Sequence, residues 1–225
     1  CWGRDHKGQL GNGGTTTADQ HSPVFVDLGT GRTAIAVSTG HIHTCAILDN
    51  GSLKCWGSDD DGRLGNGAVT GDQPSPVLVD LGTGRTAVAV VAAMYNTCAI
   101  LDDGSVKCWG GDSYGQLGNG ASITANQPSP VSVNLGTGFG AVAINMFSLH
   151  TCAILADTSM KCWGVDATGT LGNGAGTNTQ HGPTIVIGSH TWDVTTTASS
   201  ASADTAGDAT VSACLDGWSS CTTAS

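Results

Sequence analysis

The sequence predicts an all-β fold: a β-propeller-type array of about four blades, each with about 54 residues and four antiparallel strands. The motif Cys-Trp-Gly recurs at Cys1, Cys55, Cys108 and Cys162, with a spacing of about 54 residues. Between successive copies lie several short apolar segments separated by glycine-rich turns. Repeats of four short strands are typical of propeller blades.

The repeats also define the predicted domain organisation. The blade repeats fill residues 1–187, as 1–54, 55–107, 108–161 and 162–187 onward. Residues 188–225 are expected to form a degenerate last blade or closing segment. This part contains a Thr/Ser/Ala-rich stretch with little to bury, a composition typical of a flexible or O-glycosylated spacer.

Each repeat carries the same elements in the same order. The Cys-Trp-Gly arm is followed by an aspartate and then by Leu-Gly-Asn-Gly, a polar loop and a proline. A short alternating strand such as Val77-Leu78-Val79 comes next, and three copies then have a Leu-Gly-Thr-Gly turn. The following strand is rich in small residues, as in Ala87-Val88-Ala89-Val90, which suits the crowded innermost position of a blade. A hairpin completes the repeat.

The hairpin is the best defined local element. In the second copy, alternating apolar residues flank the tip Asp102-Asp103-Gly104, which is a strong hairpin signal. A three-residue loop places Cys98 opposite Cys108, and directly opposite residues have Cβ atoms about 4.5–5.5 Å apart, near the range of a disulfide. The third copy has Asp157-Thr158 at its tip and lacks the loop glycine, so we expect a different turn there.

Disulfides are the favoured interpretation of the cysteines, with free thiols or a metal site as the alternatives. The spacing does not fit a zinc knuckle, and the sequence contains no Cys-x-x-Cys. The predicted disulfides are Cys45–Cys55, Cys98–Cys108, Cys152–Cys162 and, in the degenerate hairpin, Cys214–Cys221. Cys1 is left over, and an odd cysteine in a secreted protein suggests intersubunit pairing or a missing segment.

Composition restricts the possible partners. The chain has 8 Lys and Arg against 18 Asp and Glu, a formal net charge of −10, which argues against nucleic acid and anionic membrane surfaces. No apolar run approaches the roughly 18–20 residues of a membrane span. The nine cysteines favour an extracellular or cell-surface location. Because the chain starts at Cys1 without methionine, we expect a processed product or a piece of a longer protein.

Two segments carry a family resemblance: His43-Thr-Cys-Ala-Ile-Leu-Asp-Asn-Gly-Ser-Leu-Lys-Cys-Trp-Gly57 and Gly115-Gln-Leu-Gly-Asn-Gly120. They resemble the repeats of the regulator of chromosome condensation family, and more closely its cysteine-bearing extracellular version. The resemblance covers about residues 1–187 and implies β-propeller blades, commonly seven in a closed ring. It also implies binding to other proteins or, in nuclear members, action on small GTPases. The nuclear role fits poorly with so few basic residues.

No catalytic constellation is visible, so we expect no enzyme activity, no cofactor and no metal ion. The sequence has no Gly-x-Ser-x-Gly and no His-Glu-x-x-His. His43 and His150 occupy equivalent repeat positions, which favours a packing role. The cluster Asp59-Asp60-Asp61 could hold Ca²⁺ but lacks the ligand ladder of an EF-hand, so a solvated turn is favoured.

The loops between the small-residue strand and the hairpin differ among the repeats. Loops on a rigid scaffold are where specificity is usually built, so Met94, Tyr95, Met146 and Phe147 are candidate contact residues. The alternative is that they fill the propeller channel or pack between blades. Asn50, at a hairpin tip, is the candidate N-glycan site.

These observations favour a non-enzymatic extracellular structural or assembly protein. The ragged first blade and the unpaired Cys1 suggest self-association into a homo-oligomer, filament or surface appendage. The alternative is a propeller binding module that recognises a protein or a glycan through its variable loops.

Overall fold

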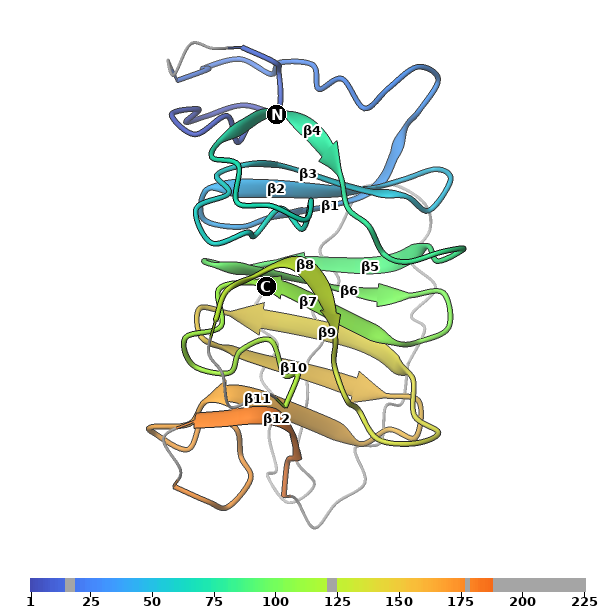
Figure 1. Cartoon of the computed structure of the whole chain (residues 1–225), viewed down its shortest axis with the longest axis vertical. Helices are drawn as coiled ribbons and strands as arrows, with labels where there is room; N and C mark the ends of the chain where they lie inside the picture. Colours follow the sequence, from blue (N-terminus) through green and yellow to red (C-terminus); the bar gives the residue numbers. More distant parts are fainter. Residues whose placement is uncertain (15–18, 121–124, 177–178, 188–225) are drawn as a thin grey trace, which may run out of the picture.

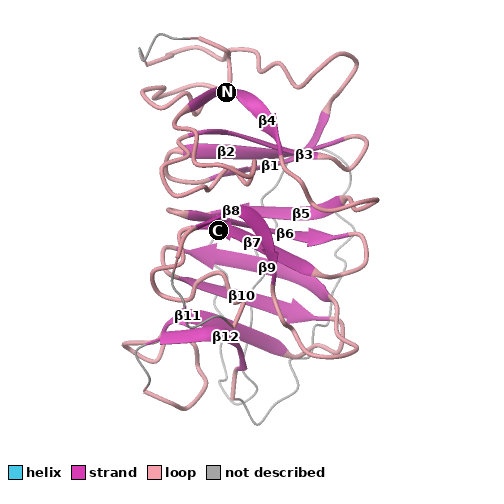
Figure 2. Cartoon of the chain, viewed as in Figure 1, coloured by secondary structure: helices cyan, strands magenta, loops and turns pink. Residues whose placement is uncertain are grey.

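The structure is a computed structural model that describes residues 1–14, 19–120, 125–176 and 179–187. All its regular elements are β-strands, and they form three four-stranded sheets that follow one another along the long axis (Figure 1). Loops connect them, and no helix is present in the described part (Figure 2). Accordingly, the described residues offer no helix with the length and apolar character to cross a membrane.

Each sheet is an antiparallel meander. The strand orders are β1-β2-β3-β4, β5-β6-β7-β8 and β9-β10-β11-β12. The strands are β1 (Ala34–Thr39), β2 (His43–Leu48), β3 (Leu53–Gly57), β4 (Gln73–Leu78), β5 (Ala87–Ala92), β6 (Asn96–Leu101), β7 (Val106–Gly110), β8 (Gln127–Ser132), β9 (Ala141–Phe147), β10 (His150–Leu155), β11 (Met160–Val165) and β12 (Thr179–Ile185). The predicted all-β blade with four antiparallel strands is therefore confirmed. The described residues before β1 carry one isolated bridge, between Gly3 and Gln20.

The central hairpin of each sheet has the predicted register. In the second sheet, Ile100 lies opposite Val106 and Cys98 opposite Cys108. The three hairpins contain the disulfides Cys45–Cys55, Cys98–Cys108 and Cys152–Cys162, with Cα–Cα distances of 4.0, 4.1 and 4.1 Å. Cys1 is a free, half-buried cysteine. The predicted pair Cys214–Cys221 and the whole closing segment 188–225 lie outside the described residues.

The prediction of a different turn in the third hairpin is wrong. Thr158 has φ of 71°, close to the 76° of Gly51 and the 79° of Gly104, and its N–H donates to the Leu155 carbonyl at 2.9 Å. The reason lies beside it: one Asp157 side-chain oxygen accepts from both the backbone N–H and the hydroxyl of Ser159. This local cap retains the turn although a threonine with positive φ is strained.

The hydrophobic cores lie between neighbouring sheets. Trp109 and Leu101 of the second sheet pack with Ile47, Leu53 and the Cys45–Cys55 disulfide of the first. Trp163 and Leu155 of the third sheet pack in the same way on the second. Burial between sheets therefore stabilises the blades, and the disulfides Cys45–Cys55 and Cys98–Cys108 lie inside such cores.

The small-residue strands β1, β5 and β9 contact one another from sheet to sheet, as expected for innermost strands. The backbone N–H of Ala92 in β5 donates to the Ser38 hydroxyl of β1 at 2.9 Å. Along this row Ile35, Val88 and Val142 occupy equivalent positions and are 67, 61 and 63% exposed.

Candidate functional site

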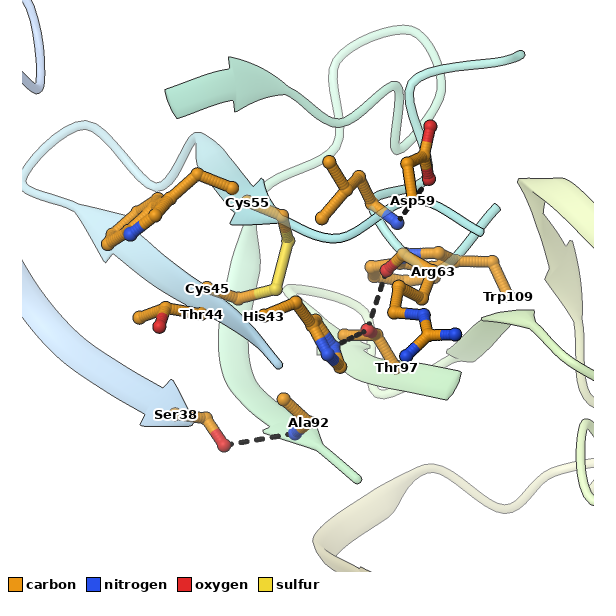
Figure 3. The surroundings of a disulfide bond; sticks show 12 residues. Ser38, His43, Thr44, Cys45, Cys55, Asp59, Arg63, Ala92, Thr97 and Trp109 are labelled. Carbon is orange, nitrogen blue, oxygen red and sulfur yellow. Dashed lines mark hydrogen bonds between the residues drawn. A yellow bond between two sulfur atoms is a disulfide. The ribbon is translucent and has the colours of Figure 1, made fainter. Parts of the chain in front are cut away.

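The junction between the first and second sheets is built around one backbone carbonyl (Figure 3). The hydroxyl of Thr97 and the indole N–H of Trp109 both donate to the carbonyl oxygen of Arg63, at 2.8 and 2.9 Å. His43 Nε2 lies 2.8 Å from the same hydroxyl. Because the hydroxyl proton is used on Arg63, Nε2 is the donor in this contact. Burial and the nearby Arg63 charge lower the pKa of His43 to about 3, so the ring is neutral.

The same arrangement recurs at the other junctions. In each case the acceptor is the backbone carbonyl of the residue directly before Leu-Gly-Asn-Gly in the preceding repeat. The buried Trp of Cys-Trp-Gly and a threonine of the same hairpin both donate to it. The pairs are Trp56 and Thr44 on Gln9, and Trp163 and Thr151 on Gln116, all at 2.9 to 3.0 Å. Packing between blades is therefore the role of these tryptophans. Trp2 differs, because it is 70% exposed.

A buried aspartate shapes each of these loops. One carboxylate oxygen accepts from the backbone N–H five residues later, at 3.0 to 3.1 Å. The pairs are Asp5–Leu10, Asp59–Leu64, Asp112–Leu117 and Asp166–Leu171. Burial raises the pKa of both Asp59 and Asp112 above the usual range of a carboxyl group. Each of these aspartates therefore caps the backbone of its own loop.

The acidic cluster forms a turn that is solvated only in part, since Asp60 is exposed whereas Asp59 is buried. Asp59 is fully buried, Asp60 lies 3.7 Å from the Lys7 ammonium, and Asp61 pairs with Arg63. Each carboxylate faces a partner of its own because the loop folds across the junction between sheets. Among the described residues, no group of three or more metal-ligating side chains comes together.

Arg63 holds together the loops at the junction between the first and second sheets. Its side chain is only 3% exposed; one guanidinium nitrogen donates to the Met94 carbonyl at 3.0 Å and another pairs with Asp61. The guanidinium carbon lies 5.7 Å from the centre of the Tyr95 ring, a cation–π distance. Sequence reasoning missed Arg63. The available signal was that the other repeats have glutamine or threonine at this position.

The four predicted contact residues separate into two groups. Tyr95 is 37% and Phe147 76% exposed. Met146 is 7% exposed, and its sulfur lies 3.3 Å from Asn96 Nδ2. Met94 is half-buried and uses its carbonyl to accept from Arg63. The packing alternative therefore describes Met146, while Tyr95 and Phe147 remain available for contacts.

Asn50 lies exposed at the tip of the first hairpin. Its side-chain oxygen accepts from the backbone N–H of Ser52 at 3.1 Å and from the Ser52 hydroxyl at 2.7 Å. The site is accessible, and N-glycosylation there stays a prediction.

A hollow of about 220 Å³ opens beside Arg63, where loops of all three sheets meet. Its lining residues are Asp61, Tyr95, Gly111, Ser113, Tyr114, Gln116, Asn126 and Leu149. Only Tyr95 among the predicted contact residues lines it.

Several known proteins are similar to this chain. Human E3 ubiquitin-protein ligase HERC2 is 29% identical over 77% of the chain but 4% of its own length. The ultraviolet-B receptor UVR8 of Arabidopsis thaliana is 28% identical over 77% of the chain and 38% of its own length. The chain thus spans well under half of these relatives.

Solved structures show the same fold. Human WBSCR16 superposes with a TM-score of 0.71 and 20% identity, over 84% of this chain and 49% of that one. Yeast RCC1 (Prp20), solved with Kap60 bound to it, gives a TM-score of 0.69 and 18% identity, over 84% and 44%. At these identities the likeness establishes the fold alone.

The three stacked sheets with recurring Trp–carbonyl junctions define the class: RCC1-like β-propeller repeats, a kind of protein-binding module. Two models of the regulator of chromosome condensation (RCC1) repeat match the chain, one over residues 1–47 and 103–154, the other over residues 34–63 and 88–116. The chain belongs to the RCC1 repeat family.

Proposed function

We propose that this chain is a non-enzymatic extracellular structural protein whose disulfide-stabilised propeller repeats self-associate into an oligomer, filament or surface appendage. The observation that carries the proposal is a face of the first sheet that no other described segment covers. Residues that a neighbouring sheet covers at the other junctions are exposed there.

The comparison of equivalent positions makes this uncovered face explicit. Ala87 of β5 is 3% exposed, while Ala34, its equivalent in β1, is exposed. Val37 of β1 is 63% exposed, while its equivalent Val90 is half-buried against the first sheet. A blade from another copy would bury Ala34 and Val37, and a head-to-tail contact of this kind can propagate.

An extracellular location is supported by the three disulfides, because such bonds are rare in reducing compartments. The location is tested by expressing the chain with and without a secretion signal and counting free thiols in the unreduced protein. We expect the chain to fold only when it is exported, with its hairpin cysteines oxidised to disulfides. A stable protein with free thiols from the cytosol would contradict the proposal.

The assembly is tested by light scattering and electron microscopy of the native, unreduced protein over a range of concentrations. Ordered oligomers or filaments are expected. Val37→Glu on the uncovered face should dissociate them, whereas Val88→Glu, at an equally exposed position of the inner row, should not. Self-association through this face would be overturned if the protein stayed monomeric at all concentrations. It would also be overturned if neither substitution changed the assemblies.

A second candidate function is a binding module that recognises a protein or a glycan. The observation that favours it is the array of Asp61, Arg63 and Tyr95, which occurs at one junction and borders the hollow. Yeast RCC1 (Prp20), which has the same fold, was solved with the protein Kap60 bound to it. Arrayed proteins and glycans, probed with the folded chain, test this function directly.

A further inference from the structure

Two tyrosines form the accessible walls of the hollow beside Arg63. Tyr95 and Tyr114 both line it, and they are 37 and 46% exposed. A tyrosine offers an apolar ring face and a hydroxyl that can donate and accept. Such rings pack well against ligands that have both apolar and hydroxyl-bearing surfaces.

The polar groups of the hollow are held in place before any ligand arrives. One Asp61 oxygen pairs with Arg63, and the other accepts from Asn126 Nδ2 at 3.0 Å. The side-chain oxygen of Gln116 accepts from the backbone N–H of Tyr114 at 2.8 Å, which anchors the loop that carries this tyrosine. A preorganised site loses less entropy when it binds.

The charge of the hollow is balanced. Among the described lining residues Asp61 is the one carboxylate, and the buried guanidinium of Arg63 neutralises it. The same guanidinium lies over one face of the Tyr95 ring. A cationic ligand would therefore find no free carboxylate, and one ring face is already taken by a cation, so the hollow suits an uncharged ligand.

At the preceding junction, between residues 1–14 and the first sheet, a lysine side chain fills the equivalent place. There the Lys7 ammonium lies 3.7 Å from Asp60 and 3.3 Å from Asp72, bridging the two carboxylates. At the hollow beside Arg63, the next repeat has Ser113 and Asn126 in place of Asp60 and Asp72. It also has Gly111 in place of Ser58. Because no lysine bridges the loops here and Gly111 has no side chain, the hollow is open.

The ligand class follows from size, charge and polarity. The cavity of about 220 Å³ is smaller than the roughly 300–1,000 Å³ of typical pockets for drug-sized ligands, so it admits one compact ring. A pyranose has an apolar C–H face for a tyrosine ring and several hydroxyls for carboxylate and amide groups, and it is neutral. We propose that this hollow binds a single neutral sugar unit of a glycan. The inference rests on the binding function proposed above and specifies its ligand and site.

The test is a titration of the folded, isotope-labelled chain with four methyl glycosides (glucose, galactose, mannose and N-acetylglucosamine), followed by amide NMR. At least one should shift the amide signals of Gly111 and Tyr114. Tyr114→Ala, which removes a wall, and Gly111→Ser, which restores the side chain of the preceding junction, should each weaken binding about tenfold. A Cβ at Gly111 would lie 3.2 Å from Tyr95 Cβ, so the fold tolerates it with a small adjustment.

Phe139→Ala is the matched control, since Phe139 is a similarly exposed aromatic residue (43%) away from the hollow. It should leave the affinity unchanged. Sugar binding that survives both hollow variants, or falls equally in the control, would overturn this site while leaving a glycan-binding function intact. Specific binding of an arrayed protein with no response to any glycoside would overturn the sugar inference and leave the protein-binding function. No binding to any probe would overturn both.

Discussion

The indole ring of Trp109 lies directly against the backbone of Gly65. A Cβ at Gly65 would come within 2.6 Å of the indole nitrogen, and φ of this glycine is +68°. The same contact joins Trp56 to Gly11 and Trp163 to Gly118. The glycine of Leu-Gly-Asn-Gly is therefore required by the tryptophan of the next blade as well as by its own turn.

Gly65→Ala should destabilise the fold strongly. The positive φ costs about 1–2 kcal/mol for any L-residue, and the clash with the indole adds about 1–3 kcal/mol. Gly84→Ala is the control, because Gly84 has φ of +72° but nothing within 4 Å of an added Cβ. Urea unfolding measures both free energies, and equal losses would contradict the importance of the Trp109 contact.

Thr158→Gly should stabilise the third hairpin, because Thr158 has φ of 71° at a position that is glycine in the other two hairpins. Relief of the strain outweighs the added freedom of the unfolded chain, for a net gain of about 0.5–1 kcal/mol. The reverse change, Gly104→Thr, should cost more than this gain, since its Cβ would lie 2.9 Å from Gly140 Cα. Thermal unfolding of both variants checks the prediction, and a destabilised Thr158→Gly would refute it.

His43 should make the protein sensitive to acid. Its pKa is about 3 in the folded state and about 6.5 when unfolded, so between these values only the unfolded state takes up the proton. The free energy of unfolding should fall as pH drops from 6.5 towards 3, by up to about 1.4 kcal/mol per pH unit. The raised pKa values of Asp59 and Asp112 act in the opposite direction just above the ordinary carboxyl range.

The contribution of His43 can be isolated with His43→Asn, because Asn96 occupies the equivalent position of the second hairpin. The variant should fold and show a shallower dependence of its unfolding free energy on pH between 6.5 and 3. Denaturant titrations at several pH values measure the slope. An unchanged slope would show that the acid response arises elsewhere.

Removal of the central disulfide by Cys98→Ala with Cys108→Ala should cost about 2.5–3 kcal/mol, because the bond closes a loop with a sequence separation of 10. Cys1→Ala is the control, since this cysteine is free in the described structure. It should leave the unfolding free energy of the isolated chain nearly unchanged. Equal effects of the two changes in chemical denaturation would contradict a stabilising role for the hairpin disulfide.

The sequence by itself determined the all-β class, the four-stranded repeat and the register of the hairpins. These features depend on local signals: alternating apolar residues, glycine at turn tips and cysteines ten positions apart. The turn at Thr158 was misjudged because the cap on the following serine, which all three hairpins share, holds the turn without a glycine.

Only the tertiary structure decided which side chains meet across the junctions. Arg63, Asp61 and Tyr95 are brought together from a loop and the turn before the next hairpin, and Asn126 joins them from a third segment. The tertiary structure also separated buried Met146 from exposed Phe147, although the two are neighbours at the end of strand β9, where the sequence had predicted a variable loop. The physical reason is that contacts between blades depend on how neighbouring sheets twist and stack, and a repeat motif specifies each sheet but leaves the distances between loops to that packing.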